Sequence, residues 1–265
     1  MAELKLVTFN LCCWWTIENC DSIENLKNTF LNRAGGILFR IREEMPDVLC
    51  FQEGTDKIIA VLEANLPEYQ FYFTQRDVGF EGEGIAVALR RDTISLLSLD
   101  SFWLSPTPNV PGTRFAEQSD YPRVCQILMV RRKSDRRLFW VCNNHLDHIG
   151  EQARVLGMRQ VIGTLADKLS AYPLPVFVFG DLNALPDSET LQFARQNDKL
   201  PLVDLTADLP GTWHDLQPET TLEKIDYILT DPITARKTYR AKRWTDDHAG
   251  VFLSDHYPVE VDIDF

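Results

Sequence analysis

The sequence has little positive charge, no long apolar run and no closely spaced cysteine motif. Its 265 residues carry 27 lysines and arginines against 39 aspartates and glutamates, a net charge of −12. This charge repels polyanions, so an anionic substrate must meet local cations or a bound metal. No stretch approaches the roughly 18 apolar residues of a membrane span, and the first residues lack the pattern of a signal peptide. We therefore expect a cytoplasmic protein with no membrane partner.

Cysteine is present, but not in a pattern that indicates a metal site or a disulfide framework. None of the six cysteines has CxxC spacing. Cys50, Cys125 and Cys142 fall in segments that we expect to be strands, which favours reduced, packed thiols over disulfides or a zinc site. The adjacent pair Cys12-Cys13 precedes two tryptophans. We expect this pair to pack locally, because no partner spacing supports a metal-binding or redox role.

The hydrophobic content, 45% of residues, is enough for a substantial core. No repeat, low-complexity segment or change of composition divides the chain, so we expect residues 1–265 to form one domain, with no obligate protein partner. Helices are predicted over 22–44, 55–66, 151–169 and 187–196, with a break allowed at Gly35-Gly36 and with Thr55 as an N-cap. Strands are predicted over 4–10, 47–54, 69–74, 84–90, 93–104, 124–132, 137–146, 176–179, 224–229, 235–244 and 257–264.

One predicted strand is distinguished by the residues that follow it. Val176 to Phe179 are apolar, Gly180 ends the run, and Asp181 and Asn183 come next. Residues two apart in an extended segment point the same way, so we expect both side chains to project beyond the sheet edge. Such a pair can hold a water molecule, with Asp181 accepting its proton and Asn183 orienting it, as a hydrolase requires. The alternative is an ordinary Asx turn at a strand end.

Ligand-type side chains recur at or near the ends of other predicted strands. In an open α/β sheet such ends gather on one rim. The donors are oxygen and imidazole without sulfur, which suits Mg²⁺ or Mn²⁺ better than zinc and indicates phosphate chemistry. The residues are Asn10, Glu53, His145, Asp181, Asn183, Asp226, Asp255 and His256.

Several cationic side chains are candidates for binding a substrate phosphate. Residues 105–122 are rich in turn formers and predict a long surface loop, with Arg114 inside it and Arg123 directly after it. Together with Arg154 and Lys224 these arginines can form a local cationic groove. The alternative for an exposed arginine is simple solvation. His148, close to the histidine at position 145, is a further candidate for substrate contact.

Six short blocks, taken in order, carry a resemblance to a known family. They are Thr8-Phe9-Asn10, Phe51-Gln52-Glu53, Asn144-His145-Leu146, Gly180-Asp181-Leu182-Asn183, Lys224-Ile225-Asp226-Tyr227-Ile228 and Ser254-Asp255-His256-Tyr257-Pro258. They extend from residue 8 to residue 258 and resemble the signature blocks of the endonuclease/exonuclease/phosphatase superfamily. Its members include pancreatic-type deoxyribonuclease, abasic-site endonucleases and inositol polyphosphate 5-phosphatases.

This resemblance implies an α/β fold, a four-layered α/β/β/α sandwich in which two mainly antiparallel sheets pack face to face. The alternation of strands and helices alone also permits a doubly wound parallel sheet, but the hairpin-like strands between residues 69 and 146 agree better with the sandwich. The resemblance further implies hydrolysis of a phosphate ester by in-line attack of an activated water, with Mg²⁺ or Mn²⁺ as cofactor.

The resemblance also implies roles for individual residues. Glu53 corresponds to the main metal ligand, with Asn10 beside the metal and the phosphate and with Asp255 as a further metal contact. Asp181 corresponds to the general base, and Asn183 to an amide that binds the nucleophile or the phosphate. Asp226 and His256 correspond to a carboxylate and imidazole pair that binds a phosphate oxygen. His145 corresponds to a histidine that contacts the phosphate or protonates the leaving oxygen.

The family resemblance does not choose a substrate. The net charge ranks a small phosphorylated metabolite, a nucleotide or a nucleic-acid end above duplex DNA. One alternative is a DNA or RNA endonuclease or exonuclease of the repair type. Another is a catalytically silent binding module with the same fold. His214, which lies before the strand that contains Asp226, is expected to be structural or peripheral.

Overall fold

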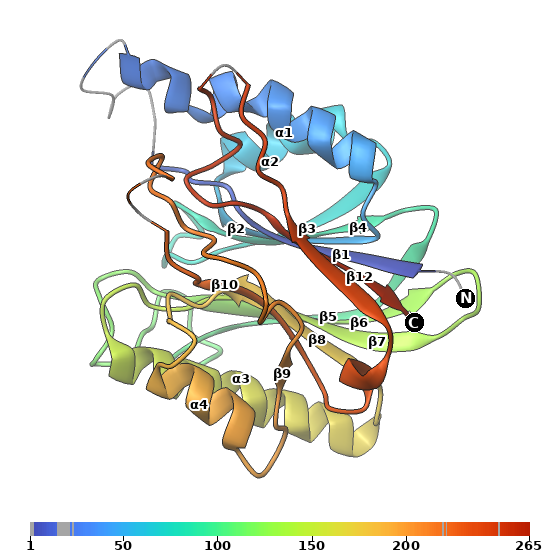
Figure 1. Ribbon diagram of the computed structural model, residues 1–265. Coiled ribbons are helices and arrows are strands. Elements are labelled where there is room, and N and C mark those ends of the chain that lie inside the picture. The colour runs from blue at the N-terminus through green and yellow to red at the C-terminus, as the bar shows by residue number, and fades with distance from the viewer. Residues whose placement is uncertain (1–2, 15–21, 23, 219, 221, 249) are drawn as a thin grey trace.

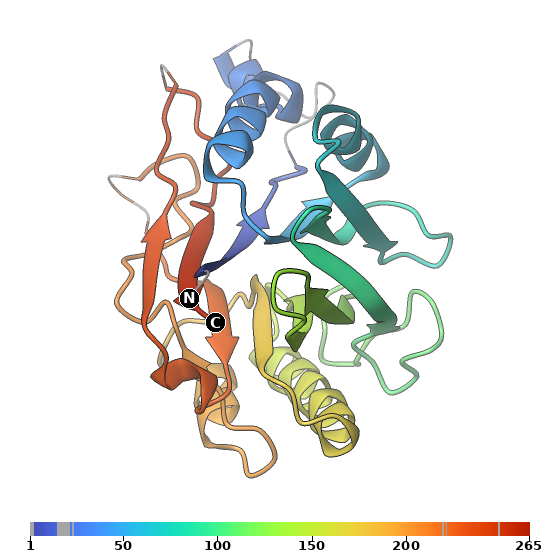
Figure 2. The same cartoon turned by 90° about the vertical axis from the view of Figure 1, so that its right-hand side faces the viewer.

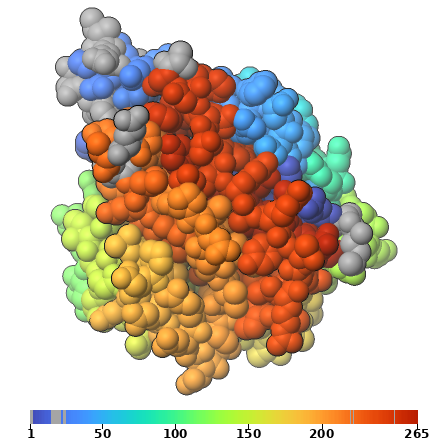
Figure 3. Space-filling view, in the orientation of Figure 1, coloured from blue at the N-terminus to red at the C-terminus, as the bar shows by residue number. Residues whose placement is uncertain are grey.

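The computed structural model describes residues 3–14, 22, 24–218, 220, 222–248 and 250–265. Two six-stranded sheets pack face to face, with helices α1 and α2 outside one sheet and α3 and α4 outside the other (Figure 1). The predicted four-layered α/β/β/α sandwich is therefore confirmed. In the space-filling view of the same side, the C-terminal third of the chain covers much of the surface between the helix layers (Figure 3).

The first sheet joins the two ends of the described chain. Its strand order is β11-β12-β1-β2-β4-β3, and all neighbours are antiparallel except β1 and β2. Glu3 of β1 pairs with Asp264 of β12, which brings the termini together (Figure 2). The strands are β1 (Glu3–Asn10), β2 (Val48–Gly54), β3 (Tyr69–Gln75), β4 (Gly84–Arg90), β11 (Tyr239–Arg243) and β12 (Val259–Asp264).

The second sheet has the same plan, with one parallel pair inside an antiparallel sheet. Its order is β5-β6-β7-β8-β10-β9, and β7 and β8 are the parallel neighbours. The ends of β1, β2, β7 and β8 thus meet at one edge of the sandwich, as a hydrogen bond from Asn10 to Asp181 shows. The strands are β5 (Ile94–Trp103), β6 (Val124–Arg132), β7 (Leu138–His145), β8 (Val176–Asp181), β9 (Val203–Asp204) and β10 (Asp226–Thr230).

The helices differ from the sequence prediction mainly near the N-terminus. The predicted helix over 22–44 is a short 3₁₀ helix η1 (Glu24–Asn28) followed by α1 (Phe30–Glu44). The helix does not break at Gly35-Gly36; a Cβ on Gly36 would lie 2.9 Å from a ring atom of His248, so this glycine allows close packing. Thr55 caps α2 as predicted, since its side chain accepts from Ile58 N. The other helices are α2 (Asp56–Asn65), α3 (Glu151–Ala171), α4 (Glu189–Gln196) and the 3₁₀ helix η2 (Thr234–Arg236).

Apolar side chains from both inner faces fill the space between the sheets. Phe139, Phe177 and Phe265 form a ring cluster there, with centroids 5.2–5.8 Å apart. Cys50, Cys125 and Cys142 lie in β2, β6 and β7 as predicted, and all five described cysteines are free thiols; Cys20 lies outside the described residues. Within the described part of the chain, no helix combines the length and apolar character needed to span a bilayer.

Candidate active site

A cleft of about 640 Å³ opens where the ends of β1, β2, β7 and β8 meet. Asn10 and Asp226 lie at the same edge, each 1% exposed, and are hydrogen-bonded to residues of the cleft. The structure thus brings most of the predicted site residues together. Those that line the cleft are Glu53, Arg123, His145, His148, Asp181, Asn183, Asp255 and His256.

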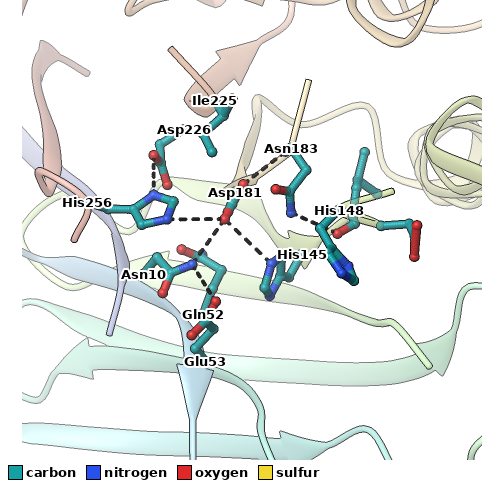
Figure 4. A network of polar contacts seen from close by, with 12 residues as sticks. Asn10, Gln52, Glu53, His145, His148, Asp181, Asn183, Ile225, Asp226 and His256 are labelled. Carbon is teal, nitrogen blue, oxygen red and sulfur yellow. Dashed lines mark hydrogen bonds and ion pairs between the residues drawn. The ribbon is translucent and has the colours of Figure 1, made fainter. Parts of the chain in front are cut away.

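Asp181, the last residue of β8, lies at the centre of a network of polar contacts (Figure 4). Its Oδ2 accepts from Asn10 Nδ2 at 3.0 Å and lies 3.5 Å from His145 Nε2 and 3.8 Å from His256 Nε2. Burial, followed by the charge of Asp226, raises the pKa of Asp181 to about 7. A carboxyl group with this pKa can accept a proton from water near neutral pH.

Gly180 allows β8 to approach β7 closely just before Asp181. A Cβ at this position would lie 2.1 Å from the backbone oxygen of Asn144, which is far inside van der Waals contact. The glycine that ends the apolar run in the sequence is therefore required by the packing of two neighbouring backbones.

Asn183 reaches the cleft by a different route from the one predicted. It lies beyond β8 in the left-handed region, with φ 47°, so strand alternation does not direct its side chain. Its backbone N donates to Asp181 Oδ1 at 2.9 Å, which is an Asx turn, and its Nδ2 donates to Leu146 O at 3.1 Å. The Asx turn and the functional pair are therefore not alternatives, because the turn places the side chains of Asp181 and Asn183 in the cleft together.

Asp226 and His256 form a buried pair beside Asp181. Asp226 begins β10, directly opposite Asp181 in the antiparallel register, and its Oδ2 lies 2.8 Å from His256 Nδ1. Burial alone would lower the pKa of His256, but the charge of Asp226 and the hydrogen bond to it outweigh burial and raise this pKa well above its usual value. His256 is therefore an imidazolium whose Nε2 faces Asp181.

His145 lies on the other side of Asp181 and has the opposite charge state. Burial and the nearby charges of Arg123 and Arg76 lower the pKa of His145 well below its usual value. The site thus places a buried carboxyl group between a neutral imidazole and a charged one (Figure 4). Asp181 and the neutral His145 can thus exchange a proton, while the charged His256 can stabilise negative charge.

Glu53 is directed into the cleft by an irregularity in β2. It has φ 57°, and the register with β4 shifts between Phe51 and Gly54. Such a bulge changes the direction of a side chain at a strand end. Glu53 Oε1 accepts from Asn10 Nδ2, and Oε2 accepts from Cys13 N, both at 3.1 Å. The carboxylate is therefore held in place by donors from β1 and from the segment after it.

Among the residues that the structure describes, two groups of side chains have ligand atoms close enough to share a metal ion. Cys13, Glu53 and Glu83 form one group, and Asp181, Asp226 and His256 form the other, each with ligand atoms within 4.8 Å of one another. In the second group His256 Nδ1 is already hydrogen-bonded to Asp226, which suits a proton-holding network better than a metal site. The carboxylates of Glu53 and Asp255 in the cleft are the hard oxygen donors that Mg²⁺ or Mn²⁺ prefers.

The predicted groove of four cations is not present as expected. Arg123 lines the cleft and is only 4% exposed. The other three cations do not line the cleft, and each forms an ion pair with a nearby carboxylate. Arg114 pairs with Asp120 in the surface loop, Arg154 with Glu151 in α3, and Lys224 with Asp204. Among the described residues, the second arginine of the cleft is instead Arg76, which follows β3.

Several residues of the cleft were not predicted from the sequence. Most of them lie outside the predicted strands and helices, so strand and helix patterns in the sequence did not mark them. Trp213 and Glu223 form a β-bridge with each other, and Ile225 directly precedes Asp226. His214 is buried with its ring 4.2 Å from that of Tyr257, which agrees with the structural role expected for it. The missed residues are Cys13, Trp14, Arg76, Glu83, Tyr121, Trp213, Glu223 and Ile225.

Comparison with known proteins identifies the family. Residues 30–256 match the model of the Endonuclease/Exonuclease/phosphatase family. The chain therefore belongs to this family of phosphoesterases and nucleases, and the resemblance found in the sequence is confirmed. None of the curated proteins compared with the chain matches it.

Solved structures with the same fold include enzymes with different substrates. An endonuclease/exonuclease/phosphatase from Bacteroides vulgatus has a TM-score of 0.85 and 23% identity, with 100% of both chains covered. A mannosyl-6-phosphatase from Bacteroides thetaiotaomicron has a TM-score of 0.83 and 23% identity, covering 99% of this chain and 100% of the other. D. rerio TDP2, complexed with a single-strand DNA product, has a TM-score of 0.72 and 17% identity, with 100% of both chains covered.

Proposed function

We propose that this protein is a metal-dependent phosphoesterase that hydrolyses a phosphate ester by in-line attack of an activated water. The observation that carries the proposal is the buried Asp181, whose pKa is raised to about 7, between a neutral His145 and a charged His256. A single domain over residues 1–265 and a cytoplasmic location remain part of the proposal.

The residues of the chain divide the reaction between them. Asp181 accepts the proton of the attacking water, and Asn183 hydrogen-bonds to that water or to the phosphate. His256, kept charged by Asp226, binds a phosphoryl oxygen on which negative charge grows. The neutral His145 contacts the phosphate, and its lowered pKa does not support the alternative role, which is supply of a proton to the leaving oxygen. Because these groups are already hydrogen-bonded in place, little reorganisation is needed during the reaction.

Glu53, Asn10 and Asp255 are the residues that would hold Mg²⁺ or Mn²⁺. Such a cation, when bound, polarises the phosphoryl oxygens and neutralises their charge. The oxygen donors of these side chains agree with a hard cation. Arg123 and His148 line the cleft beside them and are proposed to bind the substrate, whereas the positions of Arg114 and Arg154 no longer support such a role.

The substrate class proposed is a small phosphorylated metabolite, a nucleotide or a nucleic-acid end. The net charge of −12 opposes binding of long nucleic acid, and the cleft of about 640 Å³ suits a small ligand. Mannosyl-6-phosphatase is an example with this fold that acts on a small phosphate ester. The second candidate is a nuclease, supported by the likeness to TDP2 in its complex with single-strand DNA.

Hydrolysis of bis(p-nitrophenyl) phosphate and of p-nitrophenyl phosphate, with Mg²⁺, with Mn²⁺ and with a chelator, tests the proposal. We expect metal-dependent release of nitrophenolate that is lost in Asp181→Asn and in Glu53→Ala, while circular dichroism shows both variants to be folded. Near-native turnover in folded Asp181→Asn would contradict the mechanism. A steep fall of activity on oligonucleotides with rising salt would favour the nuclease instead. A wild-type chain that binds phosphate esters without hydrolysing them would indicate a silent binding module.

A further inference from the structure

Two buried arginines lie on one wall of the cleft. Arg76 follows β3 and Arg123 precedes β6; both line the cleft, with 9% and 4% of their surface exposed. Arginine is rarely this buried unless its charge is paired. The chain has a net charge of −12, so two neighbouring guanidinium groups in the cleft form a local positive region that favours an anionic ligand.

The two charges are only partly neutralised by the protein. Arg76 Nη1 donates to Glu83 Oε1, and Arg123 Nη1 lies 3.7 Å from the same oxygen. Asp77 is 3.9 Å from Arg76 Nε, and its side chain is 43% exposed, so water screens this contact. The Nε atoms of both arginines are buried without a hydrogen-bond partner among the described residues. Two buried cations thus share one half-buried carboxylate, which leaves an excess of positive charge in the wall.

Aromatic and imidazole rings hold the two guanidinium groups in place. The guanidinium of Arg76 lies 4.5 Å from the ring centroid of Tyr121, whose ring in turn packs 5.7 Å from that of His148. Arg123 Nη2 lies 3.2 Å from His148 Nδ1. Burial and the charge of Arg123 lower the pKa of His148, so its neutral ring can accept this hydrogen bond. The arginine wall is therefore arranged before any ligand binds.

The wall adjoins the place where the proposed reaction occurs. Cys13 connects the two, since its Sγ lies 3.0 Å from Glu83 Oε2 and its backbone N donates to Glu53 Oε2 at 3.1 Å. On the other side, the charges of Arg123 and Arg76 act on His145, whose pKa they lower. A phosphoryl group held between Glu53 and Asp181 would therefore lie next to both guanidinium groups.

We propose that Arg76 and Arg123 make this site selective for phosphomonoesters, by binding the additional negative charge and the additional unsubstituted oxygen of a terminal phosphate. This inference rests on the proposed phosphoesterase function. A diester has one negative charge and two unsubstituted oxygens, whereas a monoester dianion has two charges and three such oxygens. The planar fork of arginine matches the oxygens of phosphate, and a charge-assisted hydrogen bond to the third oxygen forms only with the monoester. In the reaction, the oxygen of water bonds to phosphorus and its proton passes to Asp181, the ester P–O bond breaks, and the leaving oxygen takes a proton from solvent.

Two reporters with the same leaving group test this selectivity, namely p-nitrophenyl phosphate and methyl p-nitrophenyl phosphate. We expect wild-type kcat/KM to favour the monoester. Arg76→Met should lower kcat/KM for the monoester about tenfold to a hundredfold, and for the methyl diester by less than about threefold. Arg76→Lys, which keeps the charge without the fork, should fall between. Arg159→Met is the matched control, because Arg159 of α3 lies over the ring of Phe193 of α4, 4.9 Å from its centroid, and does not line the cleft.

A second measurement needs neither turnover nor a variant. Calorimetry gives the affinity of the wild-type protein for methyl phosphate and for dimethyl phosphate. At a pH where methyl phosphate is a dianion, we expect it to bind at least tenfold more tightly than the monoanionic dimethyl phosphate. Equal binding, an equal loss on both reporters in Arg76→Met, or a wild-type preference for the diester would each overturn the inference. A binding preference without hydrolysis of either reporter would support the arginine site and contradict the proposed function instead.

Discussion

Replacement of Asp226 by asparagine is expected to remove the positive charge of His256 while the shape of the site is kept. Asp226 Oδ2 lies 2.8 Å from His256 Nδ1, and its charge is what maintains the imidazolium against burial. An amide oxygen can accept the same hydrogen bond, but it does not offset the cost of burying a charged ring, so His256 becomes neutral. Loss of one well-placed electrostatic donor costs about 3–4 kcal/mol of transition-state stabilisation, or about 10²–10³-fold in kcat.

The pH profile of Asp226→Asn should move to lower pH on both sides. The charge of Asp226, together with burial, raises the pKa of Asp181 to about 7 in the native chain. The variant loses two opposing effects on this pKa, the larger raising effect of the Asp226 charge and the smaller lowering effect of the His256 charge. The pKa of Asp181 therefore falls slightly, and the acidic limb moves down by a small amount. His256 also loses its proton at lower pH, so the alkaline limb moves down as well. The assay is kcat/KM for a nitrophenyl phosphate ester as a function of pH at saturating metal.

Asp204→Asn is the matched control for this prediction. It removes a carboxylate charge from the ion pair with Lys224, and neither residue lines the cleft. We expect both limbs of its pH profile to coincide with those of the wild type. Native turnover of Asp226→Asn at pH 7, or limbs that stay where they are in the native protein, would show that the charge of His256 is not maintained by Asp226 or is not needed for catalysis.

Two further predictions concern stability. Gly180→Ala places a Cβ 2.1 Å from Asn144 O, so the backbones of β7 and β8 must move apart. We expect the free energy of unfolding, measured in urea, to fall by about 2–3 kcal/mol. Native stability of this variant would contradict the prediction. Lys242 and Lys5 outweigh burial and lower the pKa of Glu44 from 4.5 to about 2, so this carboxylate stabilises the fold above pH 4.5 and stops doing so as the pH falls toward 2. Glu44→Gln should therefore have a lower free energy of unfolding than the wild type at pH 7, and this difference should become smaller below pH 4. A difference that does not change with pH would show that the ion pairs of Glu44 do not cause it.

The strands and the polar residues at their ends could be predicted from the sequence because both depend on local pattern. Apolar runs marked β2 and β8, and the residues after them are the ones that the structure places in the cleft. The pairing of the strands has no such signal. Alternation of strands and helices permitted a parallel sheet, and the family blocks, which reflect long-range contacts, led to the sandwich instead.

The cations show why the rest of the site could not be predicted. Arg114 and Arg154 were assigned to a groove, but acidic residues six and three positions away in the chain hold them outside the cleft. Arg76, in contrast, reaches the cleft because it packs against Tyr121, which is 45 positions away along the chain. A lone arginine after a strand carries no sign of such a contact. Acidic residues close in the sequence hold Arg114 and Arg154 in local ion pairs, whereas Arg76 reaches the cleft only through the fold.

Backbone strain at the cleft connects the site to the stability of the sandwich. Cys12, Glu53 and Asn183 are non-glycine residues in the left-handed region, and they lie at or just beyond the ends of β1, β2 and β8. Each costs of order 1–3 kcal/mol and persists only where surrounding contacts determine it. Below them, Asn143 of β7 donates to Phe51 O and Ala86 O of the opposite sheet, and its Oδ1 accepts from Gln52 Nε2. This buried link fixes the two sheets directly beneath Glu53, so the strained turns can hold Glu53 and Asn183 in the cleft without loosening the strands that carry them.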